Sequence, residues 1–293
     1  MYQEKFFNVT QKPLADIPDP PKKLFYQGDL DLIQLPAIAI VGTRHCSEYG
    51  EYVTQSLIKD LAALNIAIVS GLARGIDSIA HRTALEYGLK TIAVLGSGLN
   101  NIYPPENKNL AAEIAKKGLI LSEYPADTTA LPRNFPARNR IVSGLSIITV
   151  VIEAPSKSGA LITANCALEQ GREVFVVPGD IDRENSLGCI ELLQKGGAYP
   201  ISSAKDIIAF LNEAPTLLPQ DLVKDKPRKK IQHYKLTLDE GTLLGLLSAR
   251  RSTDIFQLQS QSGLEISTLL STLTLLEMKG LVLAQADKYR STI

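Results

Sequence analysis

The chain has 293 residues, and its 31 lysine and arginine residues balance 31 aspartate and glutamate residues. This balance excludes an attractive field over the whole molecule, so a surface for an anionic partner has to be local. Three scattered cysteines and three unclustered histidines argue against a disulfide framework and against a zinc or iron site. Neither a signal peptide nor a membrane span of roughly 18 apolar residues is evident. We therefore expect a cytoplasmic globular protein without a metal or other cofactor.

Residues 1–36 are rich in proline and predict an irregular N-terminal extension, with a short edge strand near Leu24–Tyr26. From residue 37 onward, short runs of β-branched residues alternate with longer helical patterns. The runs lack strict apolar–polar alternation, which is typical of strands buried on both faces. We therefore predict an α/β fold with a Rossmann-like, doubly wound, mostly parallel sheet over residues 37–212. The predicted strands are 37–42, 66–70, 91–96, 119–122, 147–153 and 173–179, with a short final strand near 199–201. The predicted helices are 48–64, 75–87, 107–117, 136–145, 159–170, 189–195 and 204–211.

The C-terminal part of the chain has a different pattern. Residues 213–236 contain three prolines and a basic run, which predict a linker. Residues 237–293 predict three helices and a two-stranded ribbon, the pattern of a small winged-helix domain. This domain has five basic and six acidic residues, and its third helix has only Lys279 near its end. Because phosphate-neutralising charge normally helps a helix to enter the major groove, contact with duplex DNA and contact with another protein both stay open.

Loops after four of the predicted strands carry glycine, hydroxyl and basic residues. In a doubly wound sheet, ligands bind at the carboxyl ends of the strands, where backbone N–H groups and helix N-termini favour anions. One such loop is an ordinary turn, but four that converge on one edge predict an anion site. The candidate residues in these loops are Gly42, Thr43, Arg44, Ser70, Gly71, Arg74, Lys157, Ser158 and Gly159.

The stretch FPARNR, residues 135–140, joins an aromatic residue to a basic helix start. Pro136 suits the first turn of a helix, and Asn134 is a candidate cap. Phe135 is where a nucleobase could stack, and a basic groove with an aromatic platform is typical of sequence-tolerant binding to single strands. The candidate DNA contacts of this region are Arg133, Asn134, Phe135, Arg138, Asn139 and Arg140.

Two of these arginines have competing interpretations. Arg138 and Arg140 are two positions apart on a helix and cannot point the same way. We therefore expect one of them to be structural and to pair with Glu123 or Glu153. If four to six basic residues meet phosphates, the log–log salt slope of binding should be about −3 to −4 for single strands.

Enzymatic interpretations have weaker support. The sequence GSGLNN, residues 96–101, departs from a dinucleotide fingerprint because Asn101 replaces the third glycine, and the chain has neither a P-loop nor a G-x-S-x-G elbow. A nucleotide phosphoribohydrolase-like enzyme is the first alternative, although SKSGALITANCALE lacks the paired glycines of that class and has no glutamate at the needed spacing. Asp77 and His81 lie four residues apart, and we interpret them as a pair on a helix surface rather than as an acid–base pair. The second alternative is a winged-helix transcription factor with a ligand-sensing domain.

A series of motifs resembles a known family. In chain order, these are AIVGTR, VSGLARGID, TIAVLGSGL, LSEYP, FPARNRIVSGLS, SGALITA, GREVFVVPG and GCIELLQKGGA. They are similar to the DNA-processing protein A (DprA/Smf) family over about Leu24 to Leu211. Two departures are that Pro132 stands where relatives often have lysine, and that the helical N-terminal domain of many relatives is missing.

The resemblance implies a function and partners. It implies a non-enzymatic, cytoplasmic homodimer that binds and protects single-stranded DNA without sequence preference. It also implies that the protein hands this DNA to the recombinase RecA during natural transformation. Position by position, Arg44 matches a DNA-contacting arginine and Phe135 matches a base-stacking phenylalanine. The resemblance makes Ile190, Leu192 and Leu193 the candidate dimer residues.

Overall fold

The computed structural model describes residues 5–10, 13–213, 236–247, 253–285 and 288–291. The chain divides into two compact units, Met1–Asp225 and Lys226–Ile293, and each is described by itself. The linker predicted over residues 213–236 lies almost entirely outside the described residues.

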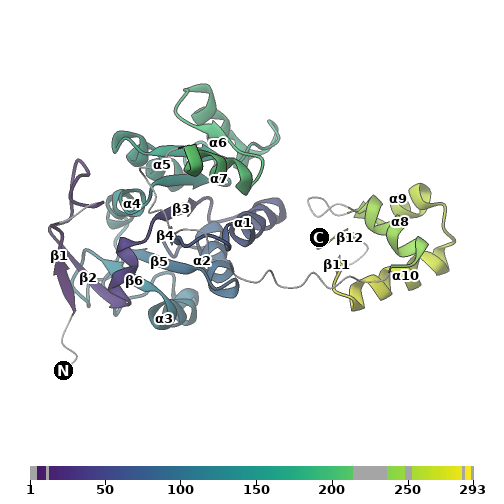
Figure 1. The fold of residues 1–293 in the computed structure, drawn as a ribbon, viewed down its shortest axis with the longest axis horizontal. Helices are drawn as coiled ribbons and strands as arrows, with labels where there is room; N and C mark the ends of the chain where they lie inside the picture. The colour runs from purple at the N-terminus through teal and green to yellow at the C-terminus, as the bar shows by residue number, and fades with distance from the viewer. Residues whose placement is uncertain (1–4, 11–12, 214–235, 248–252, 286–287, 292–293) are drawn as a thin grey trace. The chain divides into compact units, whose positions relative to one another are not determined.

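A nine-stranded sheet forms the centre of the first unit, in the order β1-β2-β6-β5-β4-β3-β7-β8-β9 (Figure 1). Every pairing from β6 through β9 is parallel, which confirms the predicted fold class. All seven predicted strands are present, with ends that shift by three residues at most. They are β3 (Ala37–Val41), β4 (Ala67–Ser70), β5 (Lys90–Leu95), β6 (Leu119–Ser122), β7 (Ile148–Val151), β8 (Glu173–Val176) and β9 (Tyr199–Pro200).

Helices cover both faces of this sheet (Figure 1). Along β3, Ile38 and Ile40 belong to the apolar core on one face, whereas Ala39 and Val41 belong to the core on the other. The first face is covered by α1 (Glu48–Leu61), α2 (Ile76–Glu86), α3 (Lys108–Lys117) and α7 (Ala204–Glu213). The second face is covered by α4 (Asn134–Gly144), α5 (Gly159–Glu169) and α6 (Glu184–Gln194). Burial on both faces explains the continuous apolar strands.

The order of the strands creates a switch point beside β3. The chain runs from β3 through β4 and β5 to β6 on one side, and then returns to place β7 on the other side of β3. The connections that leave β3 and β7 therefore diverge, and they open a crevice at the carboxyl ends of these two strands.

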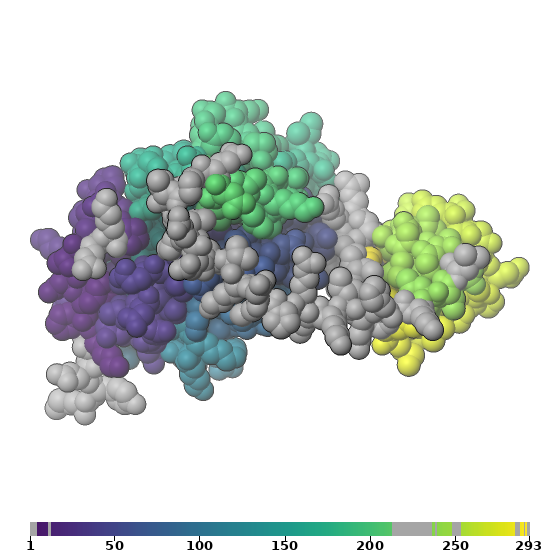
Figure 2. All heavy atoms as spheres, viewed as in Figure 1, coloured from purple at the N-terminus to yellow at the C-terminus, as the bar shows by residue number. Residues whose placement is uncertain are grey.

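The N-terminal segment confirms the short strand that we predicted near Leu24–Tyr26, but it is more regular than the extension we expected around that strand. It contributes β1 (Phe6–Asn8), β2 (Lys23–Gly28) and the 3-10 helix η1 (Leu30–Gln34), and β2 pairs antiparallel with β6. Leu14, Ile17 and Leu24 are buried in the core of the unit, and the segment (purple) covers one end of it in the space-filling view (Figure 2). The proline-rich sequence conceals this role because short edge strands are held by their tertiary pairing rather than by their own propensity.

The second unit has the predicted winged-helix pattern. Its elements are α8 (Leu238–Leu246), β10 (Thr253–Asp254), α9 (Ile255–Ser262), α10 (Ile266–Met278), β11 (Val282–Gln285) and β12 (Lys288–Ser291). Leucines from the three helices form its core, among them Leu243, Leu258 and Leu273. Thr237 and Glu240 form a capping box on α8, and Gly263 ends α9 in the left-handed conformation. The ribbon gains β10 as a third strand, in the order β10-β12-β11.

Candidate nucleic-acid interface

The loop after β3 is fixed by its neighbours on both sides. The Thr43 backbone N–H donates to the Glu153 carbonyl at 2.7 Å, which links this loop to the end of β7. The Thr43 carbonyl accepts from the Ile76 N–H at 3.2 Å, which links it to the start of α2. The loop therefore holds Arg44 at the switch point without help from the Arg44 side chain.

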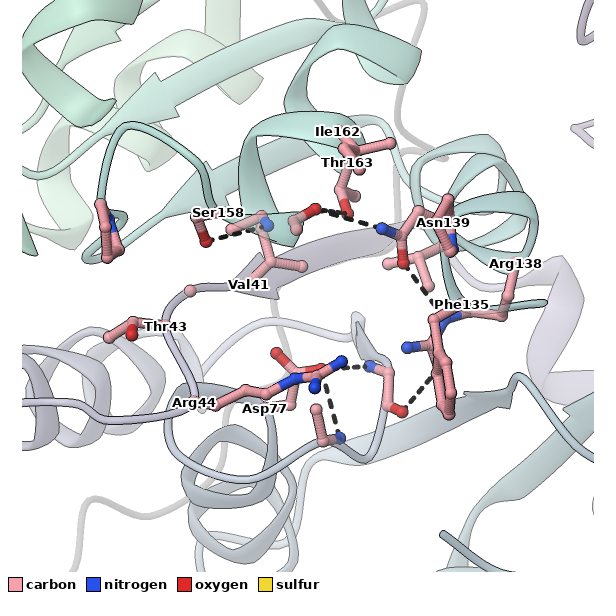
Figure 3. Close-up of a pocket in the computed structure, with 18 of the residues that line it drawn as sticks. Val41, Thr43, Arg44, Asp77, Phe135, Arg138, Asn139, Ser158, Ile162 and Thr163 are labelled. Atoms are coloured by element: carbon pink, nitrogen blue, oxygen red, sulfur yellow. Dashed lines mark hydrogen bonds between the residues drawn. The ribbon is translucent and has the colours of Figure 1, made fainter. Parts of the chain in front are cut away.

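A groove of about 550 Å³ lies at this edge of the sheet (Figure 3). It is lined by loops from β3, β4 and β7 and by the first turns of α4 and α5. Ten of the fifteen predicted contact residues line it, namely Gly42, Thr43, Arg44, Gly71, Phe135, Arg138, Asn139, Lys157, Ser158 and Gly159. The convergence that the sequence predicts is therefore present in the structure.

Arg44 and Phe135 approach each other across the groove (Figure 3). The guanidinium carbon of Arg44 lies 5.7 Å from the centroid of the Phe135 ring, within the range of a cation–π contact. The Phe135 ring packs over Gly96, where a Cβ atom would lie 2.9 Å from ring carbon Cδ1. The absence of a side chain at Gly96 lets the ring pack closely against the end of β5. The outcome is a half-buried aromatic surface beside a positive charge.

The N-terminus of α5 forms the wall beside β7. Ser158 caps this helix by accepting from the Ala160 N–H at 3.2 Å. The Asn139 side chain donates to the Gly159 carbonyl at 3.1 Å and ties α4 to α5. Lys157 is exposed at the same turn. The positive end of the helix and the Lys157 ammonium both favour an anion here.

Arg138 forms part of the floor of the groove. Its side chain is 5% exposed, and Nη1 donates to the carbonyls of Gly71, at 2.6 Å, and of Val94. Burial lowers the pKa of Arg138 to about 10, so the guanidinium keeps its charge near neutral pH. Because its guanidinium donates to both backbone carbonyls, Arg138 joins β4 to β5. Its first role is therefore structural.

Asp77 lies beside Arg138 beneath the same loop. Its carboxylate accepts from the backbone N–H groups of Gly71 at 3.1 Å and of Ala73 at 3.4 Å. Burial raises the pKa of Asp77, and the Arg138 charge opposes that rise. A Cβ atom at Gly71 would lie 2.4 Å from Arg138 and 2.7 Å from Asp77, so the two charged groups leave room only for glycine.

We expected one arginine of the pair to be structural, but both are engaged within the protein. Arg140 has the expected partner Glu123. It donates to Glu123 at 2.7 Å and to Asp19 at 2.8 Å. The Asp19 pair attaches α4 to the N-terminal segment, whereas the Glu123 pair attaches it to the end of β6. Arg140 does not line the groove. Our prediction for Arg140 as a DNA contact therefore has no support from its position.

Four other candidates also lie outside the main groove. Asn134 is the first residue of α4 and is buried, so the prediction that it caps this helix was wrong. The preceding turn, in which the Asn134 N–H donates to the Leu131 carbonyl, starts the helix earlier than expected. Arg133 is exposed at the helix N-cap. Ser70 is buried and its hydroxyl donates to the Ile40 carbonyl at 2.7 Å. Arg74 pairs with Glu106.

Tyr103 is a lining residue that the sequence analysis did not single out. Its ring centroid lies 5.6 Å from that of Phe135, and it lines the groove next to Arg44. Its position in the loop after β5, one of the four converging loops, was the available signal. Aromatic residues in loops are common, so this position alone does not distinguish Tyr103 in the sequence.

The Asp77–His81 pair was predicted to lie on a helix surface, and this was wrong. Both residues are buried because α2 packs with this side on the sheet. The Thr91 hydroxyl donates to the Ile68 carbonyl at 3.0 Å, so the hydrogen bond of 2.7 Å between His81 Nδ1 and Thr91 Oγ1 requires a proton on Nδ1. His81 Nε2 is buried without a hydrogen-bond partner among the described residues.

Acid is expected to destabilise the first unit through His81. Burial lowers the pKa of His81 to about 3, whereas the unfolded chain takes up this proton near pH 6.5. The contribution of neutral His81 to the free energy of unfolding is therefore fully present above about pH 6.5. It is lost as the pH falls towards 3, by up to about 1.4 kcal/mol per pH unit. Urea unfolding of the full chain and of His81→Leu between pH 7 and pH 4 measures this. For each protein, the free energy of unfolding is plotted against pH, and the difference between the two slopes isolates His81. The contribution of Asp77 has the opposite sign and is common to both proteins. Equal slopes would contradict the assignment.

Comparison with known proteins identifies the family. Residues 2–212 match the family model described as DNA recombination-mediator protein A. The chain belongs to this family. Residues 229–288 match the DprA winged-helix domain.

Relatives of the DprA/Smf family share most of the first unit. "Protein Smf" of Synechocystis is 47% identical over 70% of this chain and 52% of its own length. "DNA processing protein DprA" of Streptococcus pneumoniae is 46% identical over 67% of this chain and 69% of its own length. The chain thus spans about half to two thirds of these relatives. The crystal structure of the S. pneumoniae protein superposes with a TM-score of 0.68 at 43% identity, over 71% of this chain and 74% of that one.

DNA processing protein A of Helicobacter pylori provides a second structure. It superposes with a TM-score of 0.66 at 37% identity, over 72% of this chain and 96% of that chain. Its description refers to a unique single-stranded DNA binding mode of that protein.

The candidate dimer residues of this DprA/Smf chain lie on α6. Leu192 is buried in the apolar core, so it is not available to a partner. Ile190 and Leu193 are half-buried. Leu187 on α6 and Ile181 just before it are exposed by 39% and 83%.

The described residues offer neither a membrane-spanning helix nor a metal-binding cluster. In the described part of the chain, no helix is long and apolar enough to cross a membrane. Within the same residues, no group of three histidine, cysteine, aspartate or glutamate side chains is placed to hold a metal ion.

Proposed function

We propose that this protein binds single-stranded DNA without sequence preference in the groove at the switch point, and delivers it to RecA during natural transformation. The observation that carries the proposal is the Arg44–Phe135 pair, which sets a charge beside an aromatic surface in the groove of a chain of this family. A phosphate can bind at Arg44, Lys157 and the α5 N-terminus while a base stacks on Phe135.

The single-stranded DNA binding of the H. pylori relative supports this substrate class. The absence of sequence preference follows from the chemistry of the groove, because stacking and phosphate contacts accept every base.

We also propose that the protein is not an enzyme. Asp77 is the one carboxylate among the described residues that line the groove, and two backbone N–H groups and Arg138 hold it. Glu153 nearby accepts from the Ser47 N–H at 2.9 Å and from the Ser47 hydroxyl at 2.5 Å. These carboxylates are committed to structure, which leaves little for a phosphoribohydrolase to use as a base.

We further propose a cytoplasmic homodimer whose interface includes α6. The exposed Ile181 and Leu187, beside the half-buried Ile190 and Leu193, support an apolar contact there. For the winged helix, the exposed Met278, Leu275 and Leu270 of α10 favour contact with a protein over contact with duplex DNA. We also propose that the chain is divided into the segments 1–36, 37–212, 213–236 and 237–293. The strand β2 joins the first of these segments to the sheet of the second.

Fluorescence anisotropy of labelled oligothymidylate across a salt series tests the proposal. Because Arg138 and Arg140 are bound to protein groups, we expect two to four phosphate contacts and a log–log slope of about −1.5 to −3. This is shallower than the slope expected from the sequence alone. Arg44→Ala combined with Phe135→Ala should abolish most binding. A slope near zero, or equal binding by the double variant, would contradict the groove, and release of a free base from a nucleoside monophosphate would establish the enzyme instead.

A further inference from the structure

The loop between β5 and α3 holds Tyr103 firmly while leaving it exposed. The buried Ser97 hydroxyl donates to the Asn101 carbonyl at 2.6 Å on one side of Tyr103. On the other side, the buried Asn107 amide donates to the Leu72 carbonyl at 2.9 Å. Tyr103 itself is 43% exposed. A large ring displayed on a fixed loop is prepared for a contact, because little conformational entropy is lost when it binds.

The rings of Tyr103 and Phe135 stand between two hollows. Their planes meet at 51° with the centroids 5.6 Å apart. Both rings line the main groove, and both also line a smaller hollow of about 20 Å³ to which Arg74 and Pro104 contribute. A DNA strand with one base stacked on Phe135 would therefore pass Tyr103 in the direction of Arg74.

Arg74, which lines the smaller hollow, is paired with a carboxylate. Its guanidinium Nε forms an ion pair with the Glu106 carboxylate, and both side chains are about half exposed. Carboxylate and phosphate oxygens bind a guanidinium through the same charge-assisted hydrogen bonds. The Glu106 carboxylate therefore stands where a phosphate oxygen would bind. An exposed ion pair of this kind is weak enough to be exchanged for another anion.

We propose that Tyr103 and Arg74 form a second nucleotide subsite beside Phe135, and that Glu106 occupies its phosphate position when no DNA is bound. This subsite rests on the proposed function, since it extends the same binding groove. DNA would exchange the Arg74–Glu106 pair for an Arg74–phosphate pair and stack the next base on Tyr103. Glu106 is then an internal competitor that weakens binding.

Glu106→Gln tests the competition directly, because it removes the competing charge and keeps the size of the side chain. We expect affinity for an oligothymidylate of about 16 nucleotides to rise about two- to fivefold, the size of an exposed ion pair. We also expect the salt slope to steepen by about 0.7, because Arg74 then gains a phosphate without freeing a carboxylate that takes up a cation. Glu113→Gln is the matched control, since Glu113 forms an exposed ion pair with Lys117 on α3, and it should change neither quantity.

Two substitutions of Tyr103 test the stacking surface. Tyr103→Ala should weaken binding by roughly fivefold to 150-fold, the range for the loss of one stacked base, whereas Tyr103→Phe should bind like the unaltered chain. Binding that requires Phe135 but is unchanged in Glu106→Gln and Tyr103→Ala would overturn the subsite and leave the proposed function intact. No binding by the unaltered chain would overturn both.

Discussion

Arg138→Met is expected to lower the free energy of unfolding by about 3–5 kcal/mol, the cost of removing one partner from a buried charged cluster. The substitution leaves Asp77 buried beside a neutral side chain, and it leaves the carbonyls of Gly71 and Val94 without the donor that joins them. Each buried acceptor that loses its hydrogen bond adds to the cost. Urea denaturation of the full chain, followed by circular dichroism, measures the change.

Arg133→Met is the matched control for this prediction. It removes the same charge at the start of the same helix, but Arg133 is exposed, so the change should stay within about 0.5 kcal/mol. Adding Asp77→Asn to Arg138→Met should recover part of the loss, because the amide oxygen still accepts from Gly71 and Ala73 without a buried charge. A loss below about 1 kcal/mol for Arg138→Met would show that the arginine is not structural and would return it to the set of free phosphate contacts.

Phe135→Ala is expected to weaken the binding of oligothymidylate by about 1–3 kcal/mol, the range measured for one base stacked on an aromatic ring. The ring supplies a surface rather than a charge, so the salt slope should stay unchanged while the affinity falls. Arg44→Ala should behave differently and reduce the slope by about 0.7, because one phosphate contact is lost. Anisotropy titrations at several salt concentrations separate the two effects.

Phe6→Ala is the control for the loss of an aromatic ring. Phe6 is 51% exposed on β1, at the edge of the sheet and outside the residues that line the groove. It should leave DNA binding unchanged. Phe135→Leu retains apolar contact with Gly96 but lacks the ring, so it should bind almost as weakly as Phe135→Ala. Equal affinity of Phe135→Ala and the unaltered chain would mean that bases do not stack here, and that the groove binds the phosphate backbone alone.

The structure separates the arginines of α4, which are engaged within the protein, from the basic residues that face the groove. Arg138 and Arg140 are used inside the protein, the first under the groove and the second as the anchor of the N-terminal segment. Arg44 and Lys157, which come from loops after β3 and β7, carry the charge that faces the groove. A basic motif in a sequence therefore overstates the number of phosphate contacts, because arginine also satisfies buried carbonyls and carboxylates.

The sequence alone was sufficient for the fold and for the location of the groove. The strands from β3 to β8 read as apolar runs because both of their faces are covered, and the doubly wound pattern places their following loops at one edge. Gly42, Arg44 and Ser158 were predicted on that basis, Phe135 was predicted from the basic helix start beside it, and all four line the groove.

The tertiary structure decided the features that depend on contacts between segments far apart in the sequence. β1 and β2 became part of the sheet because β6 offered an unpaired edge to β2. A pairing of strands far apart in sequence leaves no local pattern that shows the partner. The burial of Asp77 and His81 followed from which side of α2 faces the sheet, while the spacing of four residues is equally compatible with a surface pair. Tyr103 gained its place because its loop lies against Phe135. Local propensity and periodicity are written in the sequence, whereas charge pairing, burial and ring contacts arise only when distant segments pack together.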